Sequence, residues 1–133
     1  MNRAYILNLN SDGENIEVKL RLTLGSQLAL KKKYNENALT TIFGALDDPE
    51  KMVAVFNQAL NYKGNQNTIK NGEELYALIA DNDLGGVTGF QQILSGIARQ
   101  SGLLTEKEKE AIDNEGKKMF DEGNFERLQQ SNK

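Results

Sequence analysis

The stretch Ile16-Glu17-Val18-Lys19-Leu20-Arg21-Leu22-Thr23-Leu24 alternates apolar and polar residues over its whole length. Side chains of a β-strand point alternately to its two faces, so a period of two predicts a strand with one buried face. A weaker alternation runs from Ala4 to Leu9, and the turn-forming residues Ser11-Asp12-Gly13-Glu14-Asn15 separate the two runs. The sequence therefore predicts an antiparallel β-hairpin over residues 4–24.

The hairpin needs helices over its apolar face, because an isolated hairpin is only marginally stable in water. From Ser26, the expected N-cap of a first helix, the apolar residues follow the helical period. We interpret residues 26–46 as two short helices, with one kinked helix as the alternative. Asp47-Asp48-Pro49 is the clearest helix start, since Asp is a preferred cap and Pro is favoured at the first helical position. The further helical segments are Met52 to Leu60, Gly72 to Ile79, Phe90 to Ile97 and Thr105 to Met119.

The order of these elements predicts the fold class. Strands followed by helices indicate an α+β protein, here an N-terminal antiparallel β-hairpin followed by a bundle of five or six short α-helices, mostly α. The chain has 133 residues, the usual size of one domain. We expect a single globular domain over residues 1–120, with the hairpin in 4–24 and the helices in 26–119. Residues 121–133 form a polar tail that we expect to fray, with Phe125 as a docking residue.

The composition disfavours several classes of function. The chain contains no Cys and no His, which removes thiolate nucleophiles, imidazole bases and most zinc ligands. Its formal net charge is -3, whereas nucleic-acid binders usually show a basic patch, and we expect Lys31-Lys32-Lys33 to be a solvated surface. The N-terminal stretch MNRAYILNLNSDGEN holds no apolar signal region. We expect a cytoplasmic protein with neither nucleic acid nor membrane as a partner.

Three short patterns were tested for chemistry, and each fails. Asp81-x-Asp83 begins like a calcium loop, but the twelfth position is Gln92, where a bidentate Glu is needed. Gly85-Gly86-x-x-Gly89 lacks the preceding strand and the lysine of a phosphate-binding loop. Carboxylate pairs such as Glu73-Glu74 lie in polar helix starts, so we expect them to be solvated surface and not a catalytic pair. We therefore expect a protein that is not an enzyme, with no catalytic residue, no cofactor and no metal site.

The first strand is the candidate for protein binding. Tyr5 and Leu7 lie on one face of it and Ile6 on the other. A strand at the edge of a sheet can recruit a partner strand unless it is protected. The alternative interpretation places this strand in the covered core of the monomer.

Five features in order carry a family resemblance: the strand Ile16 to Leu22, the segment Leu24 to Tyr34, the helix from Asp47-Asp48-Pro49 to Ala59-Leu60, the helix start Gly72-Glu73-Glu74-Leu75-Tyr76 and the break Leu84-Gly85-Gly86. With this size, order and turn placement, the sequence resembles the tail assembly chaperones of long-tailed, siphovirus-type bacteriophages and prophages of Gram-positive bacteria. The resemblance covers about residues 4–110.

The resemblance implies a protein that is absent from the finished virion, keeps the tape-measure protein soluble and helps tail-tube protein assemble around it. Such a chaperone covers apolar stripes of its client with its own apolar surface and needs no reaction. Candidate surfaces for client binding or for a homo-oligomer are the strand edge at Tyr5 and Leu7, and exposed apolar residues of later helices such as Phe90 and Leu94. The alternative function is a structural virion component, a head-tail joining or tail protein of a phage or prophage.

Overall fold

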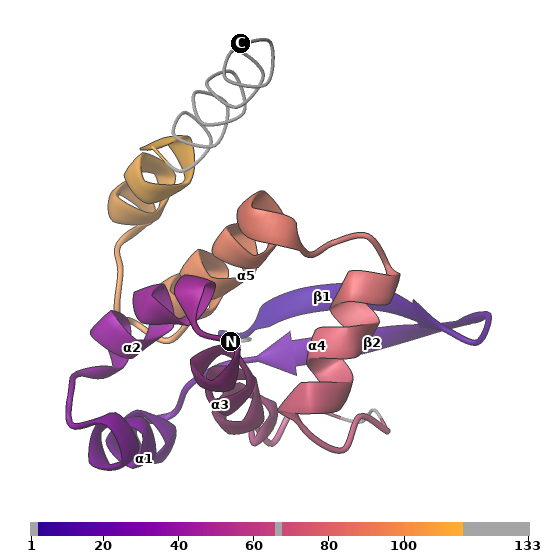
Figure 1. Cartoon of the computed structure of the whole chain (residues 1–133), viewed down its shortest axis with the longest axis horizontal. Coiled ribbons are helices and arrows are strands. Elements are labelled where there is room, and N and C mark those ends of the chain that lie inside the picture. The colour runs from indigo at the N-terminus through magenta and orange to yellow at the C-terminus, as the bar shows by residue number, and fades with distance from the viewer. Residues whose placement is uncertain (1–2, 66–67, 116–133) are drawn as a thin grey trace, which may run out of the picture.

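The computed structural model describes residues 3–65 and 68–115. The expected hairpin consists of β1 (Tyr5–Ser11) and β2 (Glu14–Leu20), which pair antiparallel (Figure 1). Asp12 and Gly13 join the strands with φ angles of 52° and 85°. Two positive φ angles define the turn type whose twist matches that of a hairpin, and glycine adopts such an angle without strain.

The two faces of the hairpin differ as the alternation predicts. Leu7, Leu9, Val18 and Leu20 are buried, whereas Asn8 and its neighbours on the other face are largely exposed. The buried face is covered by α3 (Pro49–Leu60), α4 (Gly72–Asp81) and α5 (Gly86–Gln100). Figure 1 shows α4 crossing the hairpin.

Two shorter helices precede these, α1 (Leu24–Tyr34) and α2 (Ala38–Gly44), and a single 3-10 turn, η1 (Ala45–Asp47), follows α2. Asn35 ends α1 with a left-handed φ of 54°, and the side chain of Asn37 caps α2 by accepting the N–H of Thr40 at 2.8 Å. These two breaks confirm two separate helices in this region. With a last helical segment at 106–115, the described chain is an α+β fold, mostly α, as predicted.

The predicted boundary between hairpin and first helix is wrong by several residues. β2 ends at Leu20, and α1 begins at Leu24, which is 71% exposed instead of facing the core. Thr23, not Ser26, is the N-cap, because Thr23 Oγ1 accepts the Ser26 N–H at 3.2 Å. Leu22 is buried although it belongs to no strand, which explains why the alternating pattern runs past the end of β2.

The start of α3 agrees with its sequence signal. Asp48 is the N-cap, and its side chain accepts the N–H groups of Glu50 and Lys51 at 3.0 and 3.3 Å. Phe56 of this helix is fully buried. The backbone of α3 lies so close to Gly72 that an added Cβ would overlap it, and α4 therefore begins directly against α3.

The last helical segment starts with the expected capping box. Thr105 N–H donates to Glu108 Oε1 at 2.9 Å, and Glu108 N–H donates to Thr105 Oγ1 at 3.2 Å. The predicted end of this helix at Met119 and the tail 121–133 with Phe125 lie outside the described residues.

Candidate protein-binding site

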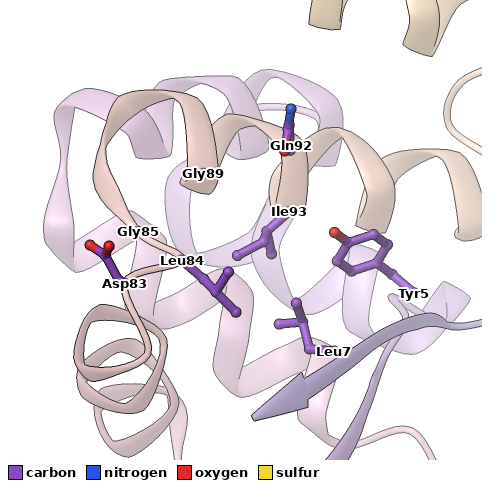
Figure 2. Close-up of a pocket in the computed structure, with 8 residues that line it drawn as sticks. All are labelled: Tyr5, Leu7, Asp83, Leu84, Gly85, Gly89, Gln92 and Ile93. Carbon is purple, nitrogen blue, oxygen red and sulfur yellow. The ribbon is translucent and has the colours of Figure 1, made fainter.

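Tyr5 and Leu7 line a surface hollow of about 290 Å³, here called the β1 hollow. It lies between β1, the connection from α4 to α5, and the first half of α5 (Figure 2). The side chains of Leu7, Leu84 and Ile93 point toward one another, whereas the carboxylate of Asp83 points away. Leu7 and Ile93 are only 7% and 2% exposed and belong to the core, as the alternative interpretation of the first strand expects for Leu7. Leu84, at 41% exposed, is the accessible apolar side chain of the hollow.

The outer edge of β1 is open beside this hollow. In a hairpin with a two-residue turn, alternate residue pairs exchange backbone hydrogen bonds, so the backbone groups of Ile6, Asn8 and Asn10 point away from β2. The side chain of Asn82 binds both outward groups of Asn10: Asn82 Oδ1 accepts the Asn10 N–H at 2.7 Å, and Asn82 Nδ2 donates to the Asn10 carbonyl at 3.0 Å. Among the described residues, none forms an outward backbone hydrogen bond with Ile6 or Asn8.

A second asparagine protects the opposite edge of the hairpin. Asn65 Oδ1 accepts the N–H of Lys19 at 2.7 Å, and Asn65 Nδ2 donates to the Lys19 carbonyl at 2.7 Å. Lys19 pairs with Ile6 in the ladder, so its outward groups lie directly across the hairpin from the open edge of β1. The amide of Asn65 therefore stands where a third strand would pair with β2.

Tyr5 packs against α5, and charges of the last helical segment act on its hydroxyl group. Its ring lies so close to Gly96 that an added Cβ there would overlap the ring. Burial raises the pKa of Tyr5, the charge of Lys109 lowers it and the charge of Asp113 raises it, with a net increase. The phenol is therefore neutral at physiological pH, and the ring forms one end of the β1 hollow.

A polar cluster beside Tyr5 ties residues 106–115 to α5. Ser95 Oγ donates to Asp113 Oδ1 at 2.6 Å, and Lys109 Nζ lies 2.7 Å from Asp113 Oδ2. Ser95 is fully buried, so its hydroxyl is out of reach of a substrate. No local sequence pattern predicts this cluster, because 18 positions separate Ser95 from Asp113.

The expectation that Phe90 and Leu94 present exposed binding surfaces is wrong. Phe90 is 8% exposed and Leu94 is fully buried. Phe90 stacks on Tyr76 with ring centroids 4.9 Å apart and lies 6.3 Å from the ring of Phe56. Both Phe90 and Leu94 are members of the hydrophobic core, and Phe90 packs there against aromatic residues of α3 and α4.

Leu84 is the most exposed apolar residue of the hollow, and its place in the break Leu84-Gly85-Gly86 does not by itself predict a binding role. It is 41% exposed, and its N–H donates to the Ile79 carbonyl at 3.1 Å. Asp83 beside it has a left-handed φ of 57°. This helix ending places an apolar residue just after the left-handed one, so the pattern Asn-Asp-Leu after α4 was the available signal.

Neither metal-site nor membrane-spanning geometry was found in the residues that the structure describes. Residues 3–65 and 68–115 hold no group of three or more acidic side chains that could bind a metal ion. None of the helices in the same part of the chain has the length and apolar character needed to cross a membrane.

Comparisons of the chain with protein-family models, with curated proteins and with solved structures found no match.

Proposed function

We propose that this protein is a tail assembly chaperone of a long-tailed bacteriophage or prophage of a Gram-positive bacterium. In this proposal it binds the tape-measure protein in the host cytoplasm, assists assembly of the tail-tube protein, and acts by protein binding without catalysis. The resemblance in sequence order and turn placement supports the family. The observation that supports a binding role is the open edge of β1 beside the β1 hollow.

The geometry suggests how an unassembled client is held. An extended client segment pairs with the outward backbone groups of Ile6 and Asn8, and an apolar client side chain enters the β1 hollow over Leu7 and Leu84. Main-chain pairing gives such docking its affinity, and the pocket for alternate side chains gives it selectivity. This mode suits a holdase, because backbone pairing requires no single client sequence.

The test is co-expression of the full chain with the tape-measure protein encoded in the same gene neighbourhood. We expect a higher soluble fraction of the client and a complex that co-purifies. Asn8→Pro removes an outward N–H without breaking the β1–β2 ladder, so it should abolish the rescue of solubility. Asn8→Ser keeps that N–H and serves as the matched control.

Leu84→Asp provides a second test that does not alter the strand. Leu84 is 41% exposed, so the substitution leaves the core intact while it places a charge in the β1 hollow. Client binding should weaken in this variant while circular dichroism stays unchanged. A client that stays insoluble with the wild-type chain, or this chain in stoichiometric amount in purified virions, would overturn the chaperone proposal.

A further inference from the structure

The side of α1 that faces solvent carries two exposed leucines. Leu24 is 71% exposed and Leu28 is 56% exposed, and a spacing of four residues places them together on one helix face. The opposite side is ordinary core, with Leu30 buried and Ser26 Oγ donating to the Gln58 carbonyl at 3.2 Å. We call Leu24, Gly25, Leu28, Ala29, Lys31 and Lys32 the outer face of α1.

Gly25 leaves this face open to close approach. A Cβ added there would meet only Thr23 Oγ1, at 3.8 Å, so the described structure gives no steric reason for a glycine. Glycine lowers helix stability relative to alanine. Because Gly25 has no side chain, the backbone of a second helix can approach α1 closely beside Leu24 and Leu28.

The C-terminal end of the outer face is basic. Lys31 and Lys32 are exposed, and within residues 3–65 and 68–115 neither forms an ion pair. Positive charge near a helix C-terminus complements the helix dipole, which accounts for a lysine in the last turn. Lys33 also lies in this turn, and its Nζ is 5.4 Å from the centroid of the Tyr34 ring. Lys31 and Lys32 therefore lie beside an apolar patch without an acidic partner in the described residues.

We propose that the outer face of α1 binds an amphipathic acidic helix of another protein. Apolar residues of that helix cover Leu24 and Leu28, and its carboxylates pair with Lys31 and Lys32. The outer face shares no residue with the β1 hollow, so this proposal does not rest on the chaperone function.

The size of the surface favours one short helix over a second copy of this chain. Eleven residues of α1 make a helix about 16 Å long. One such helix face is far smaller than the roughly 800 Å² per partner of a stable dimer, so charge attraction has to supplement the apolar contact.

The test uses two labelled 15-residue helical peptides with the same leucine face, one flanked by glutamates and the other by lysines. Fluorescence anisotropy with the full chain should show the acidic peptide binding at least tenfold more tightly than the basic one. Its affinity should fall as salt is raised, because the lysines are exposed. Equal binding of both peptides, or no binding of the acidic one, would overturn the proposal.

Variants locate the surface. Leu28→Ser should weaken binding of the acidic peptide by roughly tenfold to a hundredfold, the range for losing one buried leucine side chain. Val87→Ser is the matched control, since Val87 is 58% exposed on α5 and should leave affinity unchanged. Gly25→Ala should keep or raise the melting temperature and still weaken binding, which separates the docking surface from fold stability.

Charge reversal keeps the test decisive if Leu28→Ser affects folding. The double variant Lys31→Glu/Lys32→Glu should lose the acidic peptide and gain the basic one, whereas Lys63→Glu should do neither. Two other results would contradict the proposal: vesicles containing phosphatidylglycerol that bind the chain when the acidic peptide does not, or a dimer in sedimentation that Leu28→Ser abolishes.

Discussion

The side-chain amide of Asn82 pairs with the main chain of Asn10 as a neighbouring strand would, accepting from its N–H at 2.7 Å and donating to its carbonyl at 3.0 Å. The contact closes the turn-proximal end of the β1 edge and leaves Ile6 and Asn8 open. A single side chain from the end of α4 therefore sets how much of the β1 edge stays open.

Removing this amide should lower stability and lengthen the open edge. Asn82→Ala deletes the two hydrogen bonds to Asn10 and a third to the Leu78 carbonyl, at 2.7 Å. These contacts are partly exposed, so we expect a loss of about 1–2 kcal/mol in the free energy of unfolding, measured by urea titration. Asn61→Ala is the control, because the Asn61 side chain is exposed and forms no hydrogen bond with a described residue. A loss of similar size in both variants would contradict the role of Asn82.

Replacing Gly96, which lies against the Tyr5 ring, should destabilise the protein, whereas replacing Gly44, which has space around it, should not. Gly96→Ala places a methyl group into the Tyr5 ring and should lower the free energy of unfolding by about 1–3 kcal/mol. Gly44→Ala meets only the flexible end of Lys51, at 3.4 Å, and should be neutral or stabilising by up to about 1 kcal/mol. Thermal unfolding of both variants checks the pair, and a stabilised Gly96→Ala would show that Tyr5 is not held against α5.

The ion pair between Glu36 and Lys51 should make stability depend on pH at both ends of the scale. Lys51 Nζ lies 2.7 Å from Glu36 Oε1, and this hydrogen bond lowers the pKa of Glu36 below 4.5 and raises the pKa of Lys51 above 10.5. A lowered carboxyl pKa gives stability that is present above 4.5 and lost as pH falls through the lowered value. A raised lysine pKa gives stability that is present below 10.5 and lost as pH rises through the raised value.

Glu36→Gln checks this linkage. The midpoint of urea unfolding should fall less steeply between about pH 5 and pH 3 in the variant than in the wild type. The pKa of Glu108 is lowered mainly by the hydrogen bond from the Thr105 backbone N–H and also by that from the Thr105 hydroxyl. Glu108 should therefore contribute to the loss of stability at acid pH in both proteins. Identical slopes in the two proteins would mean that the pair contributes nothing to stability in solution.

The carboxylate of Asp113 should anchor the last helical segment to α5. Asp113→Ala removes the partner of the buried Ser95 hydroxyl and of Lys109. Amide hydrogen exchange should become faster over residues 106–113 and stay unchanged in α3. Glu110→Ala is the control on the same segment, since Glu110 is exposed and forms no ion pair with a described residue. Faster exchange in α3 as well would indicate global destabilisation instead.

The elements of this fold and the buried face of the hairpin could be predicted from local patterns, whereas the exposure of the apolar stripe of α5 could not. The helix start at Asp48-Pro49 and the capping box of Thr105 and Glu108 involve residues close together in the sequence, and the structure contains both. The apolar stripe of Phe90 and Leu94 has the same period whether a helix covers it or a partner does, so the sequence could not show which face is the core.

Long-range polar contacts left no local signal either. Asn82 and Asn10 are 72 positions apart, and Asn65 and Lys19 are 46 apart. The prediction that Leu24 belongs to the strand is wrong for a different reason. The alternation of apolar and polar residues continues through Thr23 and Leu24, but Thr23 is the N-cap of α1 and Leu24 its first residue. The strand pattern and the helix cap therefore overlap in the sequence.

Because Asn82 follows Asn10 by 72 positions, their contact can form only some time after the hairpin has been synthesised. The hairpin is a local structure that can form in microseconds. At 5–20 residues per second, the ribosome needs roughly 4–14 s to deliver Asn82 after Asn10. During that interval the hairpin lacks both its covering helices and the Asn82 contact, so the outward backbone groups of Asn10 are exposed together with those of Ile6 and Asn8.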